Sequence, residues 1–173
     1  MTTNTTTKKR TTSRAKKPTS TTPQNKKLPP NPFMNEILDL VHEQETEEDK
    51  VKILQQYAND ALKTLLIWNF DESIISLLPS GEVPYQPNES PLGVDHSSLR
   101  RDYKNLYNFV KGGNDSLSKI RRETIFIQIL ESLHPNEAEV LILVKDKNLE
   151  DKYDISFDVV QKAYPDIVWG NRS

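Results

Sequence analysis

Hydrophobic residues recur every three or four positions along most of the chain after residue 32, a pattern that predicts a series of amphipathic helices. The clearest run extends from Val51 to Leu66, and it follows Thr46, a suitable N-cap, and three acidic residues that favour the start of a helix. We therefore predict one continuous helix over about 47–68. The same reasoning predicts helices over 33–42, 71–78, 97–110, 116–133 and 156–164.

The apolar segment VLILV, residues 140–144, is compatible with either a buried strand or a buried helix. Its flanking sequences, EAE and KDKNLEDK, are rich in helix-forming residues, and Pro135 suits the first position of a helix. We therefore favour a buried helix that begins at Pro135. The predicted fold class is all-α: a compact bundle of about six or seven short helices.

Residues 79–95 interrupt this pattern with four prolines and two glycines, which leave no regular element intact. A loop of this length in a compact domain usually wraps the core or binds a partner. We therefore consider Tyr85, within the loop, and Trp169, near the C-terminal end of the sequence, as candidate partner-binding residues.

The N-terminal part of the chain differs from the rest in composition. Residues 1–32 are rich in Thr, Ser, Asn and Pro, and they offer too little apolar area to offset the entropy cost of ordering. We predict a disordered basic tail over 1–32 and a helical domain over 33–173. The tail cations, which are candidate nucleic-acid contacts, are Lys8, Lys9, Arg10, Arg14, Lys16, Lys17, Lys26 and Lys27.

The formal net charge of −2 conceals this division, because the 23 basic and 25 acidic residues are unevenly distributed. Residues 1–30 carry a charge of +8 with no Asp or Glu, so residues 31–173 carry −10. Such a charged segment has no fold with which to read bases, and its expected partner is DNA or RNA, bound without sequence specificity.

A second cationic region lies within residues 99–122, where seven basic residues face two acidic ones. Phosphate-backbone binding by this helix–Gly-Gly–helix segment is one interpretation. The other is that the cations pair with acidic residues of neighbouring helices, or that an Arg pair is buried and stabilises the fold. The candidate nucleic-acid contacts in this region are Arg100, Arg101, Lys104, Arg121 and Arg122.

Several kinds of chemistry find little support. The chain has no Cys, its five glycines form no nucleotide-binding fingerprint, and its three His are isolated. We expect no enzymatic activity, no cofactor and no metal site. No run of about 18 apolar residues is present, so we expect no membrane association.

Five stretches together carry a resemblance: LKTLLIWNFDESIISLLP (62–79), VPYQPNESPLG (83–93), LRRDYKNLYNFVKGGN (99–114), RRETIFIQILESLHPNEAEVL (121–141) and YPDIVWGNRS (164–173). They resemble a family of small, functionally uncharacterised proteins of T4-like tailed phages, including marine and cyanobacterial phages. The resemblance implies an accessory role and a location in the host cytoplasm or the virion. It implies no catalytic residue.

Two functional hypotheses remain. In the first, a small non-enzymatic phage accessory protein associates with nucleic acid through its basic tail, while its helical body contacts a phage or host protein of replication, transcription or packaging. In the second, the chain is a purely protein-binding adaptor or virion component, and the loop 79–95 and the C-terminal Trp169 form its interface.

Overall fold

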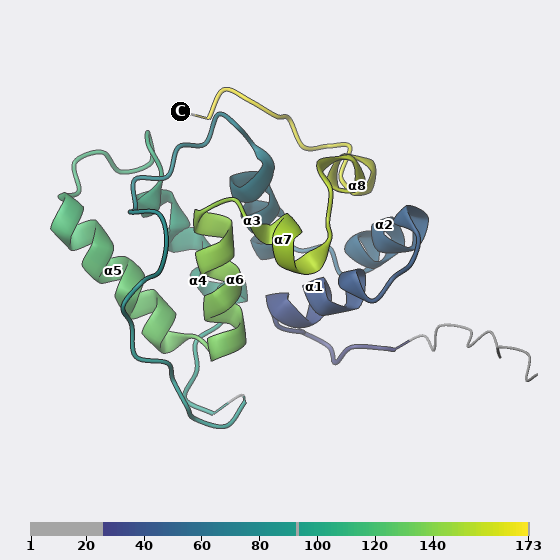
Figure 1. Cartoon of the computed structure of the whole chain (residues 1–173), viewed down its shortest axis with the longest axis horizontal. Helices are drawn as coiled ribbons and strands as arrows, with labels where there is room; N and C mark the ends of the chain where they lie inside the picture. The colour runs from purple at the N-terminus through teal and green to yellow at the C-terminus, as the bar shows by residue number, and fades with distance from the viewer. Residues whose placement is uncertain (1–25, 93, 173) are drawn as a thin grey trace, which may run out of the picture.

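The computed structural model describes residues 26–92 and 94–172, and in these ranges the chain forms eight α-helices, one 3-10 helix and no β-strand (Figure 1). The predicted all-α class is therefore confirmed for the described part of the chain. The helices are α1 (Met34–His42), α2 (Glu47–Gln56), α3 (Asp60–Phe70), α4 (Leu99–Asp102), η1 (Tyr103–Phe109, 3-10), α5 (Lys119–Ser132), α6 (Pro135–Lys145), α7 (Leu149–Tyr153) and α8 (Phe157–Ala163).

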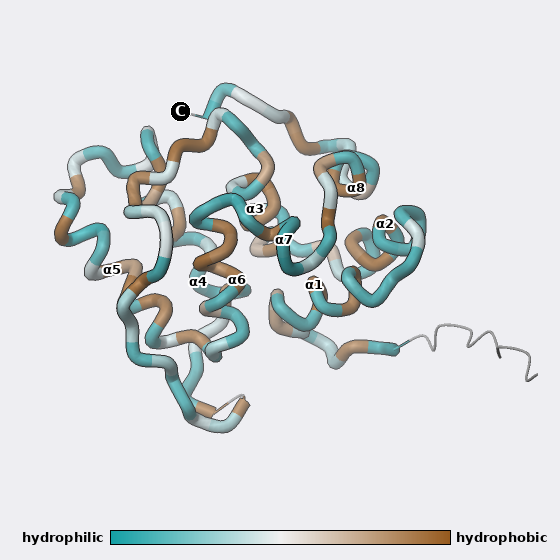
Figure 2. Tube along the Cα trace, in the orientation of Figure 1, coloured by the Kyte–Doolittle hydropathy of each residue, from teal (hydrophilic) through white to brown (hydrophobic). Residues whose placement is uncertain are grey.

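Helix α6 occupies the middle of the molecule and contacts α1, α3, α5 and α7 (Figure 1). It contains the segment 140–144, and Val140, Leu141 and Val144 are completely buried in the core. The hydrophobic stretch along α6 is visible in Figure 2. The choice of a buried helix over a strand is therefore confirmed, and Pro135 is its first residue, as expected.

The predicted helix over 47–68 is wrong in one respect, because the chain forms two helices there. α2 ends at Gln56, and α3 begins at Asp60. The Asn59 side chain accepts a hydrogen bond from the Leu62 amide (2.9 Å) and so caps a new helix. The apolar period continues across the break because both helices pack on the same core, and this is why the pattern did not reveal the break.

The helical turn predicted over 71–78 is also wrong. The Asp71 carboxylate accepts hydrogen bonds from the amide and the hydroxyl of Ser73 (2.9 and 2.6 Å) and holds the backbone in a local turn. Farther along, Ser76 forms an isolated antiparallel bridge with Val110. The segment therefore runs extended beside the end of η1.

The helix predicted over 97–110 is one turn of α-helix, α4, followed by the 3-10 helix η1. Leu106 and Phe109, three residues apart, are both buried, as the three-residue turn of a 3-10 helix allows. Gly112 then adopts a left-handed φ of 83°, consistent with the predicted Gly-Gly stop. A Cβ on Gly113 would collide with the Tyr107 carbonyl, so the turn requires glycine there.

The remaining helices follow the prediction closely. α1 begins at Met34, and α5 and α8 are capped by the side chains of Ser118 and Ser156. α5 begins three residues later than the predicted Ser116, and α7 was not predicted as a separate helix. Among the described helices, none combines the length and apolarity that crossing a bilayer requires.

The first half of the proline-rich loop, residues 79–86, is hydrogen-bonded to α5 and α6. Lys145, which is buried, donates hydrogen bonds to the carbonyls of Pro79 (2.8 Å) and Gly81 (3.2 Å). The Gln86 amide donates to Glu131 of α5 (3.0 Å). Residues 79–86 therefore wrap the core, as one of the two expected roles requires, whereas Leu92 and Val94 farther along the loop are exposed.

Candidate functional site

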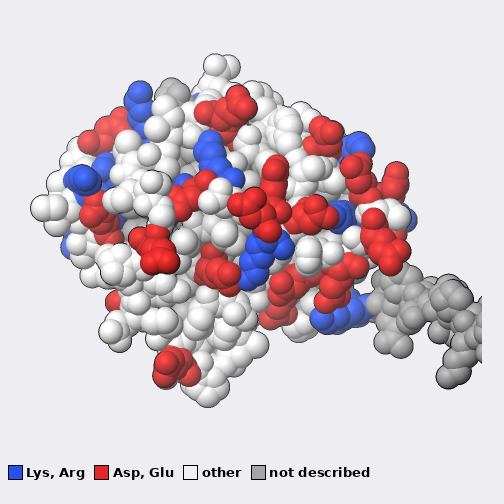
Figure 3. Space-filling model, in the orientation of Figure 1, with Lys and Arg blue, Asp and Glu red and all other residues white. Residues whose placement is uncertain are grey.

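Most lysines of the described chain are neutralised by a nearby carboxylate. Acidic side chains cover much of the face that carries α1, α2 and α7, with basic side chains among them (Figure 3). Lys162 of α8, for example, pairs with Glu47 of α2 (2.8 Å), and Lys152 pairs with Glu139 (2.6 Å). The described cations in ion pairs are Lys26, Lys50, Lys52, Lys63, Lys119, Lys145, Lys152, Lys162 and Arg172.

The segment formed by α4, η1, the Gly-Gly turn and the start of α5, residues 99–122, is different; we call it the cationic hairpin. Four of its basic side chains are exposed and form no ion pair with any described residue: Arg101, Lys104, Lys111 and Arg121. Lys104 lies over the Tyr103 ring, 6.0 Å from its centre, and Tyr107 is 53% exposed. The hairpin therefore combines unneutralised cations with accessible aromatic rings.

Two of the predicted nucleic-acid contacts have structural roles. Arg122 is buried, and its guanidinium donates to the carbonyls of Asn108 (2.9 Å), Asn114 (3.1 Å) and Leu117 (2.9 Å). Its proposed role as a phosphate contact needs correction, because its donors face inward and are used to close the turn. Arg100 is half-buried and donates to the Pro32 carbonyl (2.9 Å).

The tail cations predicted as nucleic-acid contacts lie mostly outside the described residues: Lys8, Lys9, Arg10, Arg14, Lys16 and Lys17. The structure describes the other two. Lys26 pairs with Glu43, the residue after α1 (3.3 Å), whereas Lys27 is exposed and has no ion-pair partner among the described residues. The chain then contacts the body, where the Leu28 amide donates to the Tyr57 hydroxyl (3.1 Å).

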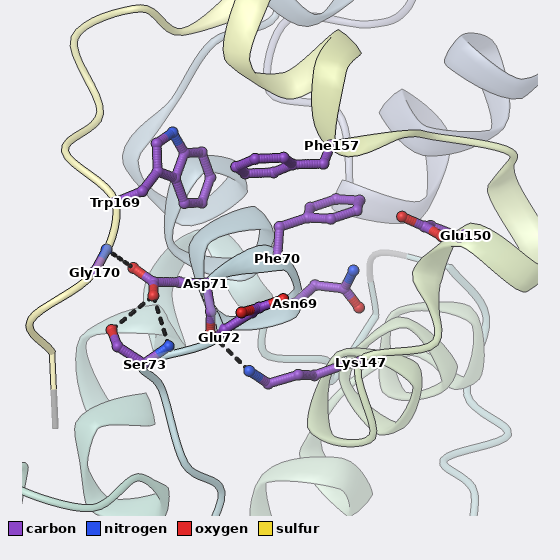
Figure 4. A pocket seen from close by; sticks show the side chains of 10 residues that line it. All are labelled: Asn69, Phe70, Asp71, Glu72, Ser73, Lys147, Glu150, Phe157, Trp169 and Gly170. Carbon is purple, nitrogen blue, oxygen red and sulfur yellow. Dashed lines mark hydrogen bonds between the residues drawn. The ribbon is translucent and has the colours of Figure 1, made fainter.

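Trp169, predicted to bind a partner, lines a surface pocket of about 850 Å³ between the end of α3, the start of α7 and the C-terminal segment (Figure 4). Its ring packs edge-to-face on Phe157 with 4.9 Å between ring centres, and Phe157 is 6.2 Å from Phe70. Tyr85, the other predicted residue, does not line this pocket; it is half-buried in the loop 79–95. The structure therefore does not bring the two candidates together in one site.

The Asp71 side chain holds the C-terminal segment beside the pocket. Its carboxylate is buried and accepts hydrogen bonds from the Gly170 amide (2.9 Å) and the Arg172 guanidinium (2.6 Å), in addition to those from Ser73. Gly170 has a φ of 90°, a conformation that glycine adopts without strain. Asp71 thereby fixes the backbone next to Trp169 and positions its ring (Figure 4).

These contacts lower the pKa of Asp71. Burial alone would raise it, but the hydrogen bonds from Ser73, Gly170 and Arg172 outweigh burial and bring the pKa from 3.8 to about 2. Since the folded-state pKa lies below the unfolded value, the carboxylate stabilises the fold above pH 4. This contribution is lost as the pH falls toward 2.

We expect the substitution Asp71→Asn to reduce the free energy of unfolding by about 2 kcal/mol at pH 6, because that is the energy equivalent of the pKa shift. The difference between the variant and the wild type should shrink as the pH falls from about 4 toward about 2, where about half of the folded wild-type protein has a protonated Asp71. Urea unfolding at several pH values measures this. A difference that stays constant down to pH 2 would contradict the assignment.

Two of the three histidines, His96 and His134, lie against each other. His96 Nε2 lies 2.8 Å from the Ser90 carbonyl oxygen, and its ring meets His134 edge-on at 5.3 Å. The pKa of His134 is lowered by burial and by the neighbouring His96. No group of three or more His, Asp or Glu residues in the described chain is placed to hold a metal ion.

Of the residues that line the pocket, only Trp169 is predicted from the sequence, and its two aromatic neighbours, Phe70 and Phe157, are not. Phe70 follows a hydrophobic run and Phe157 lies at the start of the helix predicted over 156–164, and nothing in the sequence around either residue marks a binding site. Both are half-buried, and they meet Trp169 only because α3, α8 and the C-terminal segment converge. The pattern of residues within one helix does not indicate which elements of the folded chain lie next to it. The cluster DESI after Phe70, which contains the Asp71 turn, was the nearest hint in the sequence.

Fold and surface define a small all-α protein with an internally paired acidic body and a cationic hairpin. More specifically, the chain belongs to DUF6433, a family of unknown function, which it matches over residues 37–151. This span includes the cationic hairpin and Asp71, whereas Phe157 and Trp169 lie beyond it. Neither a curated protein nor a solved structure matches the chain significantly.

Proposed function

We propose that this chain is a small, non-enzymatic accessory protein that associates non-specifically with nucleic acid through its cationic hairpin and its basic N-terminal segment. The observation that supports this proposal is the concentration of unneutralised charge. Within the described residues, exposed Lys and Arg without an ion pair are Lys27 and four members of the hairpin: Arg101, Lys104, Lys111 and Arg121.

A basic side chain without an ion-pair partner gains more free energy on binding a phosphate than an ion-paired one does. An ion-paired lysine such as Lys162 must give up its carboxylate before it meets a phosphate, whereas Arg121 exchanges only water and counterions. The hairpin backbone is held in place by Arg122, so its exposed cations are carried on a fixed support. Tyr107 adds an exposed ring on which an unpaired base can stack.

The binding is proposed to be non-specific because backbone contacts of this kind position a protein on nucleic acid without reading its sequence. The acidic body would repel phosphates and so leave the hairpin side facing the nucleic acid. The face of the acidic body that points away from the hairpin is then available to a protein partner. We propose a phage or host protein of replication, transcription or packaging as that partner, in the host cytoplasm or the virion, on the basis of the resemblance to tailed-phage proteins.

The test is a fourfold substitution in the full chain, R101Q/K104Q/K111Q/R121Q. Each phosphate contact on duplex DNA contributes about 0.9 to the slope of log K against log salt concentration, so we expect the slope to become shallower by about 3 to 4. A fluorescence-anisotropy titration with a labelled duplex at several salt concentrations measures the slope. The same titration with single-stranded DNA and RNA identifies the preferred form.

The matched control is K52Q/K63Q/K152Q/K162Q, which removes the same charge from lysines that form ion pairs. It should change the slope far less than the hairpin variant does. Equal effects of the two variants would show that net charge, rather than the hairpin, governs binding. Absence of wild-type binding at low salt would remove the nucleic-acid proposal.

The alternative proposal is a protein-binding adaptor or virion component without a nucleic-acid role. It is favoured by the pocket that Trp169 lines, since a half-buried tryptophan beside an open cavity is a common anchor for a partner. The titration separates the two proposals. A wild-type protein that binds no nucleic acid but loses its co-purifying partner on Trp169→Ala substitution would support the alternative.

A further inference from the structure

The pocket beside Trp169 has an unusual lining, which is independent of the nucleic-acid proposal. One side consists of three aromatic rings, Phe70, Phe157 and Trp169, and the other carries charged side chains (Figure 4). Its volume of about 850 Å³ is within the usual range for small-ligand sites. The class of ligand that the pocket fits can therefore be inferred from the lining rings and charges that have no partner in the described chain.

The aromatic rings present faces that no described cation occupies. Successive ring centres are 6.2 and 4.9 Å apart, and all three rings are half-buried, so part of each contacts solvent. The cation–π contacts of the described chain involve other rings, those of Tyr103, Tyr153 and Tyr164. The electron-rich faces at the pocket are thus available to a ligand.

The pocket lining carries a net negative charge, because the carboxylates of Glu72 and Glu150 outnumber the ammonium of Lys147 and the Asp71 carboxylate is paired with Arg172. Glu72 and Glu150 are exposed, and neither carboxylate forms a hydrogen bond or ion pair with a described residue. The cation of the lining, Lys147, donates to the Asp71 carbonyl (2.6 Å), as Figure 4 shows. The Asp71 carboxylate is itself occupied by Ser73, Gly170 and Arg172.

From this combination we infer that the pocket binds an organic cation, an ammonium or guanidinium group that lies against the rings of Phe70 and Trp169 and is attracted by Glu72 and Glu150. The faces of aromatic rings attract such cations electrostatically, and the attraction grows when water is excluded. The two carboxylates add a longer-range attraction.

Other ligand classes fit less well. An anion would be repelled by Glu72 and Glu150 and attracted, among the lining residues, by Lys147 alone, one of whose donors is bonded to the Asp71 carbonyl. The Asn69 side-chain oxygen accepts from the Leu149 amide (3.1 Å) and is used in the fold. A hard metal ion needs several converging oxygens, and the described residues provide no such cluster. A cation with an apolar surface can pack against the aromatic rings and be attracted by the carboxylates.

The experiment uses the full-length protein and two probes of the same shape, choline and 3,3-dimethyl-1-butanol, which lacks the charge. Two-dimensional ¹H–¹⁵N NMR follows the indole N–H of Trp169 and the amide of Gly170, both at the pocket. We expect choline to shift these signals saturably and to bind about tenfold more tightly than the alcohol, a ratio equivalent to about 1.4 kcal/mol. Methylguanidinium, tested in parallel, distinguishes an arginine-like source of the cation from a quaternary ammonium.

Substitutions at the exposed carboxylates test the charge without disturbing the fold. E72Q/E150Q should weaken choline binding about fivefold or more and leave binding of the alcohol unchanged. The control E45Q/E89Q removes two exposed acids outside the pocket lining and should change neither. Trp169→Leu, which keeps an apolar side chain, should weaken choline binding by a similar factor, followed at the Gly170 amide.

Three results would overturn the inference: no saturable shift with either cation, equal affinities for choline and the alcohol, or an E72Q/E150Q variant that binds choline as well as the control does. None of these results bears on the nucleic-acid titration, because the cationic hairpin and the pocket share no residue.

Discussion

Replacement of Glu137 by alanine is expected to lower the free energy of unfolding by about 3–5 kcal/mol, the largest effect we foresee for a single substitution. Glu137 is completely buried in the first turn of α6. Its carboxylate accepts hydrogen bonds from the Met34 amide (2.9 Å) and the Leu99 amide (3.0 Å). These are the first residues of α1 and α4, so one side chain caps two other helices.

The effect is expected to be large because α1 and α4 have no side-chain N-cap of their own. The N-cap residues of α1 and α4, Phe33 and Ser98, make no side-chain capping hydrogen bond. Without Glu137 the Met34 and Leu99 amides would be buried without an acceptor, at a cost of about 1–3 kcal/mol each. Burial raises the pKa of Glu137, although both amides and Arg100 oppose this shift.

Chemical denaturation of the wild type, Glu137→Ala and Glu137→Gln measures this contribution. Glutamine retains one carbonyl oxygen but turns an N–H₂ group toward the second amide, so we expect a loss close to that of alanine. Glu139→Gln, on the exposed side of the same helix, is the control and should change stability by less than about 1 kcal/mol. A Glu137→Ala protein as stable as this control would contradict the capping role.

Replacement of Arg122 by methionine is expected to cost about 2–4 kcal/mol, since its guanidinium donates to three carbonyls that would be left without this donor. Arg122→Lys should recover only part of the loss, because an ammonium cannot reproduce the spacing of the planar guanidinium donors. The midpoint of urea unfolding gives the ranking of wild type, Lys and Met.

The neighbouring Arg121 provides the matched comparison. Arg121 is exposed and has no ion pair among the described residues, so Arg121→Gln should leave stability within about 0.5 kcal/mol of the wild type and weaken nucleic-acid binding. Arg122→Lys should do the reverse under conditions in which it remains folded. If the two variants behaved alike in both assays, the division of roles between adjacent arginines would be wrong.

The elements predicted correctly from sequence are those whose signals are local. Pro135 at the start of α6, Ser156 before α8 and the Gly112–Gly113 turn each act within one helical turn of their own position. The apolar run 140–144 was resolved by its flanks, because helix formers on both sides outweighed the strand preference of the run itself.

The wrong predictions over 47–68 and 71–78 have the same physical cause: a polar side chain hydrogen-bonds to the backbone and competes with a continuous helix. Asn59 caps α3 and divides a continuous apolar period, while Asp71 forms a turn where the hydrophobic residues alone favoured a helix. Both side chains can also occupy helices, and their choice here depends on the packing around them. The burial of Arg122 was open from sequence, since adjacent arginines give no indication of which one faces inward.

The capping of α1 by Glu137 also constrains how the chain folds during its synthesis. Glu137, which accepts the hydrogen bond from the Met34 amide, lies 103 residues farther along the chain. At a translation rate of about 5–20 residues per second, that acceptor emerges from the ribosome about 5–20 s later. Tyr164, whose hydroxyl donates to the Leu54 carbonyl, comes later still. The nascent N-terminal helices thus remain incomplete for most of translation, a window in which a chaperone can engage them.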